Sequence, residues 1–188
     1  MTKIILGICA LIVLASPSQA QSRYDRSGFW IGFGVGGGVN VDNGLDGQQL
    51  AGGAGYFRLG GTPSSHVLLG FEGIGWARYN LGETLARGNG TFTVMVFPSD
   101  RSGFFVKGGV GGASVTQVED FGFRTRTAAG FGATLGLGAD VKVGRNIYLT
   151  PNVDWLFQAF DSSNFGFGFG RIPNTNSIIL FTLGLTWH

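Results

Sequence analysis

The sequence contains almost no cysteine and little charge. Its one cysteine, Cys9, lies in an apolar run at the N-terminus, so the rest of the chain has no disulfide bonds to stabilise it. Charged residues make up 13% of the chain, about half the share in a typical soluble domain. The formal net charge is only +2, and this balance gives no reason to expect nucleic acid as a partner.

Histidine is also scarce, which limits the chemistry that the chain can perform. The two histidines are His66 and His188. Ser64 and Ser65 adjoin His66, but no acidic residue stands near them to complete a Ser-His-acid triad. No group of Cys, His and carboxylate residues has metal-ligand spacing. We therefore predict that the protein is not an enzyme and uses neither a cofactor nor a metal.

The sequence lacks a hydrophobic run long enough for a membrane-spanning helix. The N-terminal apolar stretch, 4–14, is about half of the roughly 20 residues that such a helix needs. It is followed by a proline and by the small residues of Ser18-Gln19-Ala20, which is the pattern of a signal peptide. We predict a signal peptide at 1–20, cleaved between Ala20 and Gln21, and one domain at 21–188.

Glycine and phenylalanine are abundant, with 35 and 17 residues. After residue 20 glycine interrupts every candidate helix, and extended stretches separated by turn residues fill the chain instead. Within 126–143, Phe131, Leu135 and Leu137 share one face and Thr134 the other, a period of two that indicates a strand. The eight expected strands are 28–41, 48–60, 66–78, 88–98, 103–117, 126–143, 146–160 and 175–187.

Alternation alone does not say which face meets water. A soluble, lipocalin-like barrel turns its apolar face inward, and a membrane barrel turns it outward. The polar faces consist mainly of glycine and threonine, too sparse for a solvated surface, and the strands are longer than the usual 5–6 residues of soluble sheets. Aromatic residues near the strand ends suggest interfacial girdles: Phe29, Trp30, Trp76, Tyr79, Phe97, Phe104, Tyr148, Phe160 and Trp187. We predict an all-β, antiparallel, up-and-down transmembrane barrel of about eight strands, with the lipocalin-like barrel as the alternative.

The expected connections alternate between short and long. The short turns are 61–65, 98–102 and 144–146, and the longer loops are 42–47, 79–87, 118–125 and 161–174. Outer-membrane barrels have short turns in the periplasm and longer loops outside, so we place both termini on the periplasmic side. Pro151 stands in mid-strand without an N–H to donate, and we expect a β-bulge there.

The last segment, Phe181-Thr-Leu-Gly-Leu-Thr-Trp187-His188, alternates apolar residues and closes on an aromatic, which one further residue follows. With this segment and its strand pattern, the chain resembles the small eight-stranded outer-membrane β-barrels of the OmpA/OmpX-like kind. The resemblance implies a location in the cell outer membrane of a Gram-negative bacterium. It also implies an assembly signal that the insertion machinery reads, made of Phe181, Leu183, Leu185 and Trp187. It implies no common activity, because members serve as anchors, adhesins, small channels or lipid enzymes.

Charged residues on the inward faces are the main candidate site. The alternation points seven of them into the lumen: Arg58, Glu72, Arg78, Lys107, Asp140, Lys142 and Asp154. Unpaired charges are costly in a low-dielectric interior, so we expect these residues to pair. The interior of an eight-stranded barrel is only wide enough for side chains, which favours a plugged lumen. The many lumen glycines leave a gated ion path as the alternative.

Two motif matches do not predict a function. The segment Gly32-Phe-Gly34-Val-Gly36-Gly37 fits a dinucleotide-binding pattern by letter, but no helix is expected after it to hold a pyrophosphate. The segment 42–47 begins like a calcium loop, yet its third residue is glycine, and Gly53 stands where the bidentate Glu is needed. We interpret the first as glycine alternation in a strand and the second as an ordinary loop.

The longest expected loop, 161–174, alternates Phe and Gly between Phe165 and Gly170. It either extends a hairpin beyond the bilayer or presents aromatic side chains to a partner, since exposed loops commonly carry function. We predict a monomeric structural or interaction barrel in outer-membrane lipid, with outer loops that bind an extracellular ligand. The alternatives are a small channel or transporter for solutes and, with less support, a lipid-modifying enzyme.

Overall fold

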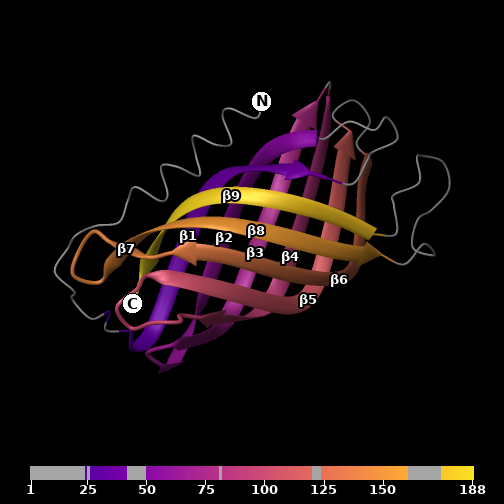
Figure 1. The fold of residues 1–188 in the computed structure, drawn as a ribbon. Coiled ribbons are helices and arrows are strands. Elements are labelled where there is room, and N and C mark those ends of the chain that lie inside the picture. The colour runs from indigo at the N-terminus through magenta and orange to yellow at the C-terminus, as the bar shows by residue number, and fades with distance from the viewer. Residues whose placement is uncertain (1–23, 25, 42–49, 81, 120–123, 161–174) are drawn as a thin grey trace.

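The computed structural model describes residues 24, 26–41, 50–80, 82–119, 124–160 and 175–188. Within these residues eight long strands and one short strand form a closed antiparallel barrel (Figure 1). In the same part of the chain, no helix is long and apolar enough to span a membrane. The prediction of an all-β, up-and-down barrel is confirmed.

The long strands contain 13 to 16 residues each, as expected for tilted strands that cross a bilayer and extend beyond it. Their cores coincide with the expected segments, because period-two alternation of apolar and small residues continues through each one. The strands are β1 (Gly28–Asn40), β2 (Leu50–Ser64), β3 (Val67–Asn80), β4 (Glu83–Val96), β5 (Phe104–Glu119), β6 (Arg124–Ala139), β7 (Val141–Lys142), β8 (Ile147–Phe160) and β9 (Thr175–Trp187).

The barrel closes because β9 pairs with β1 and β6 pairs with β8, while the other long strands pair with their neighbours in sequence. β7 is an extension beyond β6 that also pairs with β8. From Ile31 on β1, the directly opposite residues on successive strands can be followed around the barrel to Ser177 on β9. Ser177 does not lie opposite Ile31, because its carbonyl accepts a hydrogen bond from the backbone N–H of Val41. The barrel is thus sheared by ten residues, from Ile31 to Val41, and this stagger decides which side chains meet inside it.

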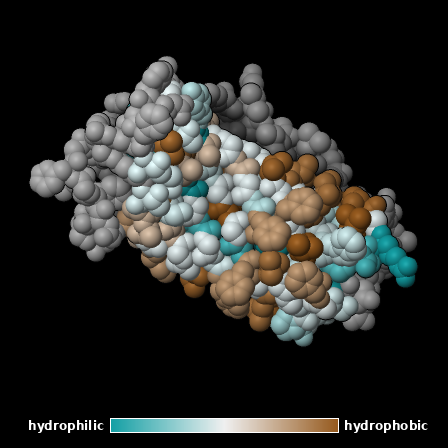
Figure 2. Space-filling model, turned by 180° about the vertical axis from the view of Figure 1, so that it is seen from behind, coloured by the Kyte–Doolittle hydropathy of each residue, from teal (hydrophilic) through white to brown (hydrophobic). Residues whose placement is uncertain are grey.

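The outer wall of the barrel is apolar. Phe33 is 54% exposed, Phe71 66% and Leu183 51%. The inward face of the same strands carries buried polar and charged residues. Figure 2 shows brown apolar side chains gathered over part of the rear wall, next to paler small residues. An apolar surface of this extent is stable against lipid rather than water, so the soluble lipocalin-like alternative is wrong.

One predicted loop is wrong. The segment 79–87 is a tight hairpin in which β3 ends at Asn80 and β4 begins at Glu83. Gly82 has a φ of 84°, a left-handed conformation that such a short turn needs and that glycine adopts without strain. The polar residues that suggested a loop, such as Glu83 and Thr84, belong to the start of β4, where it pairs with β3.

The predicted β-bulge at Pro151 is also wrong. β8 keeps one register along β6 and β7, because Gly138 pairs with Asn152 and Val141 with Leu149. The pairing of β8 with β6 and β7 is interrupted only between Asn152 and Leu149. This interruption contains Pro151, which has no N–H to donate. A register shift occurs instead in β2, between Gly61 and Ser64, where β2 pairs with β3.

Only part of the predicted aromatic girdle faces outward. Its exposed members are Phe29, Tyr79, Phe104 and Trp187. The other five are buried inside the barrel: Trp30, Trp76, Phe97, Tyr148 and Phe160. The reason is strand parity, since neighbouring residues point to opposite sides of the wall and only every second residue reaches lipid.

Candidate functional site

Four charged side chains from four strands meet inside the barrel. They are Arg58 on β2, Glu72 on β3, Lys107 on β5 and Asp154 on β8, and the side chain of each is 0% exposed. Lys107 Nζ contacts Glu72 Oε1 and lies 3.0 Å from Asp154 Oδ1. Arg58 Nη1 lies 4.0 Å from Glu72 Oε1. We call these four residues the lumen cluster, in which two cations face two carboxylates.

The strand register places these side chains together. Arg58 is directly opposite Glu72 on neighbouring strands. Lys107 on β5 and Asp154 on β8 are separated by β6. Both lie directly opposite Gly136 of β6, one on each side of it. A Cβ at Gly136 would overlap Asp154 Oδ1 and lie 2.8 Å from Lys107 Cε. The pair therefore forms across a glycine, whose missing side chain leaves room for both groups.

A chain of hydrogen bonds leads from the lumen cluster toward the end of the barrel at which His188 lies. Arg58 Nη2 donates to Thr186 Oγ1 at 3.2 Å, and the hydroxyls of Thr186 and Thr150 are 2.8 Å apart. Thr150 Oγ1 donates to Asp140 Oδ1 at 2.8 Å, and Asp140 Oδ2 lies 3.3 Å from His188 Nε2. Asp140 is thus inside the barrel, but it joins the lumen cluster only through two threonines.

Apolar side chains and one arginine close the barrel at this end. The apolar group consists of Trp30, Leu68, Met95, Phe97 and Phe105, all buried. The Arg26 guanidinium lies over the Phe97 ring, 3.7 Å from its centroid, and donates to Ser102 O at 2.8 Å. Burial lowers the pKa of Arg26. The positive group therefore covers the mouth of the lumen instead of extending into solvent.

Tyr24 completes this closure. Its ring stacks on Tyr148 with centroids 5.8 Å apart, and its hydroxyl donates to Asp140 O at 3.1 Å. Burial raises the pKa of the Tyr24 phenol, an effect that the charge of Arg26 opposes. Neither residue was predicted from the sequence, because both precede the first strand and no periodicity marks them.

The other half of the lumen is filled by a second apolar group and by amide side chains. The apolar group consists of Tyr56, Ile74, Trp76, Leu156, Ile178 and Leu180. Beside it, Gln158 Nε2 donates to Asn89 Oδ1 at 2.8 Å, and Arg87 Nη1 donates to Gln158 Oε1 at 3.4 Å. Arg87 was missed because the expected strand began one residue later. Its shared parity with Asn89 and Thr91 is the signal that would have found it.

Of the seven predicted lumen charges, Lys142 lies outside the lumen, and Arg78 lies at the end of it, on the same side of β3 as Glu72 and Trp76. Lys142 is exposed on β7, because this short strand extends past the end of the barrel, where the wall no longer encloses it. Arg78 is half-exposed near the end of β3. The four residues of the predicted assembly signal face outward on β9: Phe181, Leu183, Leu185 and Trp187. The predicted cleavage site, Ala20 and Gln21, and the loop 161–174 lie outside the described residues.

The lumen cluster is enclosed between two apolar groups, so it can cross-link strands but cannot receive a sizeable substrate. Three of its polar atoms have neither a hydrogen bond nor an ion pair in the described part of the chain: Arg58 Nε, Glu72 Oε2 and Asp154 Oδ2. In that same part, no three His, Cys, Asp or Glu side chains are grouped so as to hold a metal ion. The chemistry that the geometry supports is ion pairing across the barrel.

Comparison with known proteins shows similarity in fold. No family model matches the chain, and no curated protein is similar to it in sequence. Among solved structures, Neisserial surface protein A (NspA) has a TM-score of 0.57 and 14% identity, covering 86% of this chain and 97% of that one. Ail, the attachment invasion locus protein of Yersinia pestis, solved with the heparin analogue sucrose octasulfate, has a TM-score of 0.56 and 10% identity, covering 86% and 98%.

The chain therefore has the fold of the small outer-membrane β-barrels, as its final strand and alternation implied. Its apolar outer wall is the lipid-facing surface of a barrel located in the cell outer membrane.

Proposed function

We propose that the chain is a non-conducting outer-membrane barrel with no enzymatic activity, which anchors its outer loops for interaction with a partner outside the cell. The observation that carries this proposal is the filled lumen. The lumen cluster is neutral as a group and fully buried, and apolar side chains lie on both sides of it. An ion that entered would have to displace these side chains.

A role in interaction is supported by the position of the strand ends. β8 ends at Phe160 and β9 begins at Thr175, at the end of the barrel opposite His188, and the 14 residues between them form the longest connection in the sequence. The solved structure of Ail holds a heparin analogue, which is an anionic sugar derivative. A partner of this chain would be recognised by the residues between 161 and 174, where Phe and Gly alternate.

Conductance in planar lipid bilayers tests the closed lumen. The purified, folded barrel is expected to give no ion current above that of the bare bilayer. Lys107→Gln is compared with Lys142→Gln, which removes an exposed cation outside the lumen. A current in the wild type that Lys107→Gln abolishes and Lys142→Gln leaves unchanged would contradict the proposal.

A small channel is the second candidate, and one observation favours it. The three polar atoms of the lumen cluster without a protein partner could be solvated by water inside the barrel, which is the first requirement of an ion path. The same bilayer measurement separates the two candidates, because a channel conducts in the wild type and a plugged barrel does not.

A further inference from the structure

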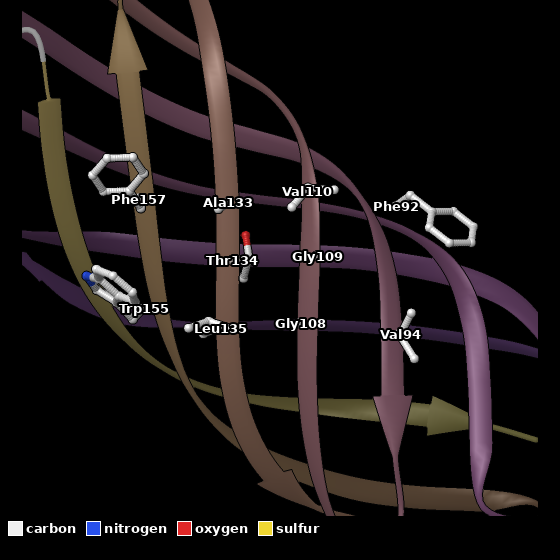
Figure 3. A pocket seen from close by; sticks show the side chains of 10 residues that line it. All are labelled: Phe92, Val94, Gly108, Gly109, Val110, Ala133, Thr134, Leu135, Trp155 and Phe157. Carbon is white, nitrogen blue, oxygen red and sulfur yellow. The ribbon is translucent and has the colours of Figure 1, made fainter.

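The outer wall of the barrel has an apolar groove across β4, β5, β6 and β8. It consists of two adjoining hollows, with volumes of about 440 and 380 Å³, that share Leu135 and Trp155. Figure 3 shows the first hollow, where the outward-facing Gly108 leaves the wall between Val94 and Leu135 without a bulky side chain. We call the two hollows together the wall groove.

The wall groove lies on the face of the barrel that meets lipid. Its sides are formed by outward-facing residues, such as Phe92 at 46% exposure, Val110 at 59% and Trp155 at 42%. Gly108 faces outward at its floor, and a Cβ there would meet only Leu135 Cδ2 at 3.4 Å. The groove is therefore an open, apolar hollow with Gly108 at its floor, a shape that suits a flexible hydrocarbon chain better than the broad wall of a second barrel.

Exposed cations lie at the end of the same strands. Arg101 is in the turn between β4 and β5, and Lys142 and Arg145 are in the segment between β6 and β8. The two turns are adjacent, because Asp140 N donates to Gly103 O at 2.9 Å. All three cations are exposed, and within the described residues none of them forms an ion pair with a carboxylate. We call these three residues the cationic rim.

The distance between the wall groove and the cationic rim fits one lipid leaflet. Leu135 in the groove and Val141 at the rim are six residues apart along β6 and its extension β7. This separation is roughly 20 Å at about 3.3 Å per residue. With a strand tilt of about 45°, this is a rise of roughly 14 Å, close to half of the ~30 Å hydrocarbon core. A headgroup at the rim would place its acyl chain in the groove.

We infer that the wall groove and the cationic rim together form a binding site for one anionic phospholipid of the leaflet at the short-turn end of the barrel. An acyl chain lies in the groove, and the phosphate meets Arg101, Lys142 and Arg145. This site rests on the proposed function only in requiring a barrel embedded in lipid. It does not require that the lumen be closed or that the loops bind a partner.

Native mass spectrometry of the folded barrel tests the site. The barrel is released from detergent micelles that contain equal amounts of phosphatidylglycerol and phosphatidylcholine with the same acyl chains. One phosphatidylglycerol is expected to remain bound, at least about tenfold more often than phosphatidylcholine. The variant Arg101→Gln/Lys142→Gln/Arg145→Gln is expected to lose this preference. Arg78→Gln, a cation at the opposite end, serves as its control and is expected to keep it.

The groove is tested separately by Gly108→Phe, which fills it, and by Trp155→Ala, which removes one side and cannot overpack the wall. Both are expected to reduce retention of phosphatidylglycerol and phosphatidylcholine several-fold. Gly73→Phe is the matched control, because Gly73 also faces outward but lies on β3, away from the groove.

Equal retention of the two lipids by the wild type, or unchanged retention in the triple variant, would overturn the site. So would a dimer of the barrel that Gly108→Phe disrupts, because the groove would then be covered by a second copy. Heat-modifiable gel mobility of every variant reports the embedded barrel independently. A variant that loses lipid binding but keeps the mobility shift on heating has lost this site alone. Absence of the mobility shift in the wild type would contradict the barrel itself.

Discussion

Replacing Lys107 by methionine tests whether ion pairing in the lumen stabilises the barrel. Lys107 is the cation between Glu72 and Asp154, and its side chain is fully buried. Methionine keeps most of the side-chain volume and removes the charge. Two buried carboxylates then share the single cation Arg58, which lies 4.0 Å from Glu72.

The expected cost follows from the enclosure of the cluster. Removing one partner of a buried ion pair typically costs about 3–5 kcal/mol, because the remaining charge stays buried without compensation. The loss should fall in this range, since the apolar groups on both sides limit access of water to Asp154. Adding Asp154→Asn to Lys107→Met restores one cation to one carboxylate, and the double variant is expected to regain about half of the loss or more.

The free energy of unfolding of each variant is measured by urea titration in detergent micelles, with tryptophan fluorescence as the signal. Lys142→Met is the control, because Lys142 is exposed on β7, and its effect should stay within about 0.5 kcal/mol. A loss below about 1 kcal/mol for Lys107→Met would refute the reasoning. So would a double variant that is less stable than Lys107→Met alone.

Three further predictions concern other parts of the barrel. Gly136→Ala should destabilise by about 1–3 kcal/mol in the same assay, because its methyl group would overlap a lumen carboxylate; Gly90→Ala, with nothing within 4 Å of the new Cβ, should change stability little. Absorbance titration, taken as the difference from Tyr24→Phe, should show the Tyr24 phenol ionising above the usual pKa of about 10. Its contribution to stability should be complete below that pH and lost as the pH rises through the raised pKa. A normal pKa would mean that the ring is not buried. Arg26→Ala should cost about 1–2 kcal/mol through lost contact with Phe97, measured against Arg101→Ala in an exposed turn; equal, small effects of the two would show that the closure contributes nothing.

The sequence predicted the inward residues best in the middle of strands and worst at their ends. Lys107 and Asp154 stand among alternating residues, so their side of the wall follows from parity. Lys142 has the same parity as Asp140, but the wall ends between them, and parity does not show where a strand leaves the barrel. Arg87 was not predicted to face the lumen for the opposite reason, because β4 already includes the residues before 88 whose polarity suggested a loop.

Residues outside the strands had no periodic signal. Tyr24 and Arg26 close the lumen through stacking, a cation–π contact and hydrogen bonds to backbone carbonyls. Such contacts depend on which turns happen to lie nearby in space. The segment before β1 therefore could not be assigned a role from its composition.

The sequence by itself determined the class of the protein, its strands and, for most positions, which side chains face lipid, because a period of two and the near absence of charge require only local information. Only the tertiary structure decided which inward residues meet. The register of β5, β6 and β8 brings Lys107 across Gly136 to Asp154, within a barrel whose shear is ten residues, from Ile31 to Val41. The stagger between strands is a property of the closed barrel, set by the packing of all its side chains together, and no single strand contains it.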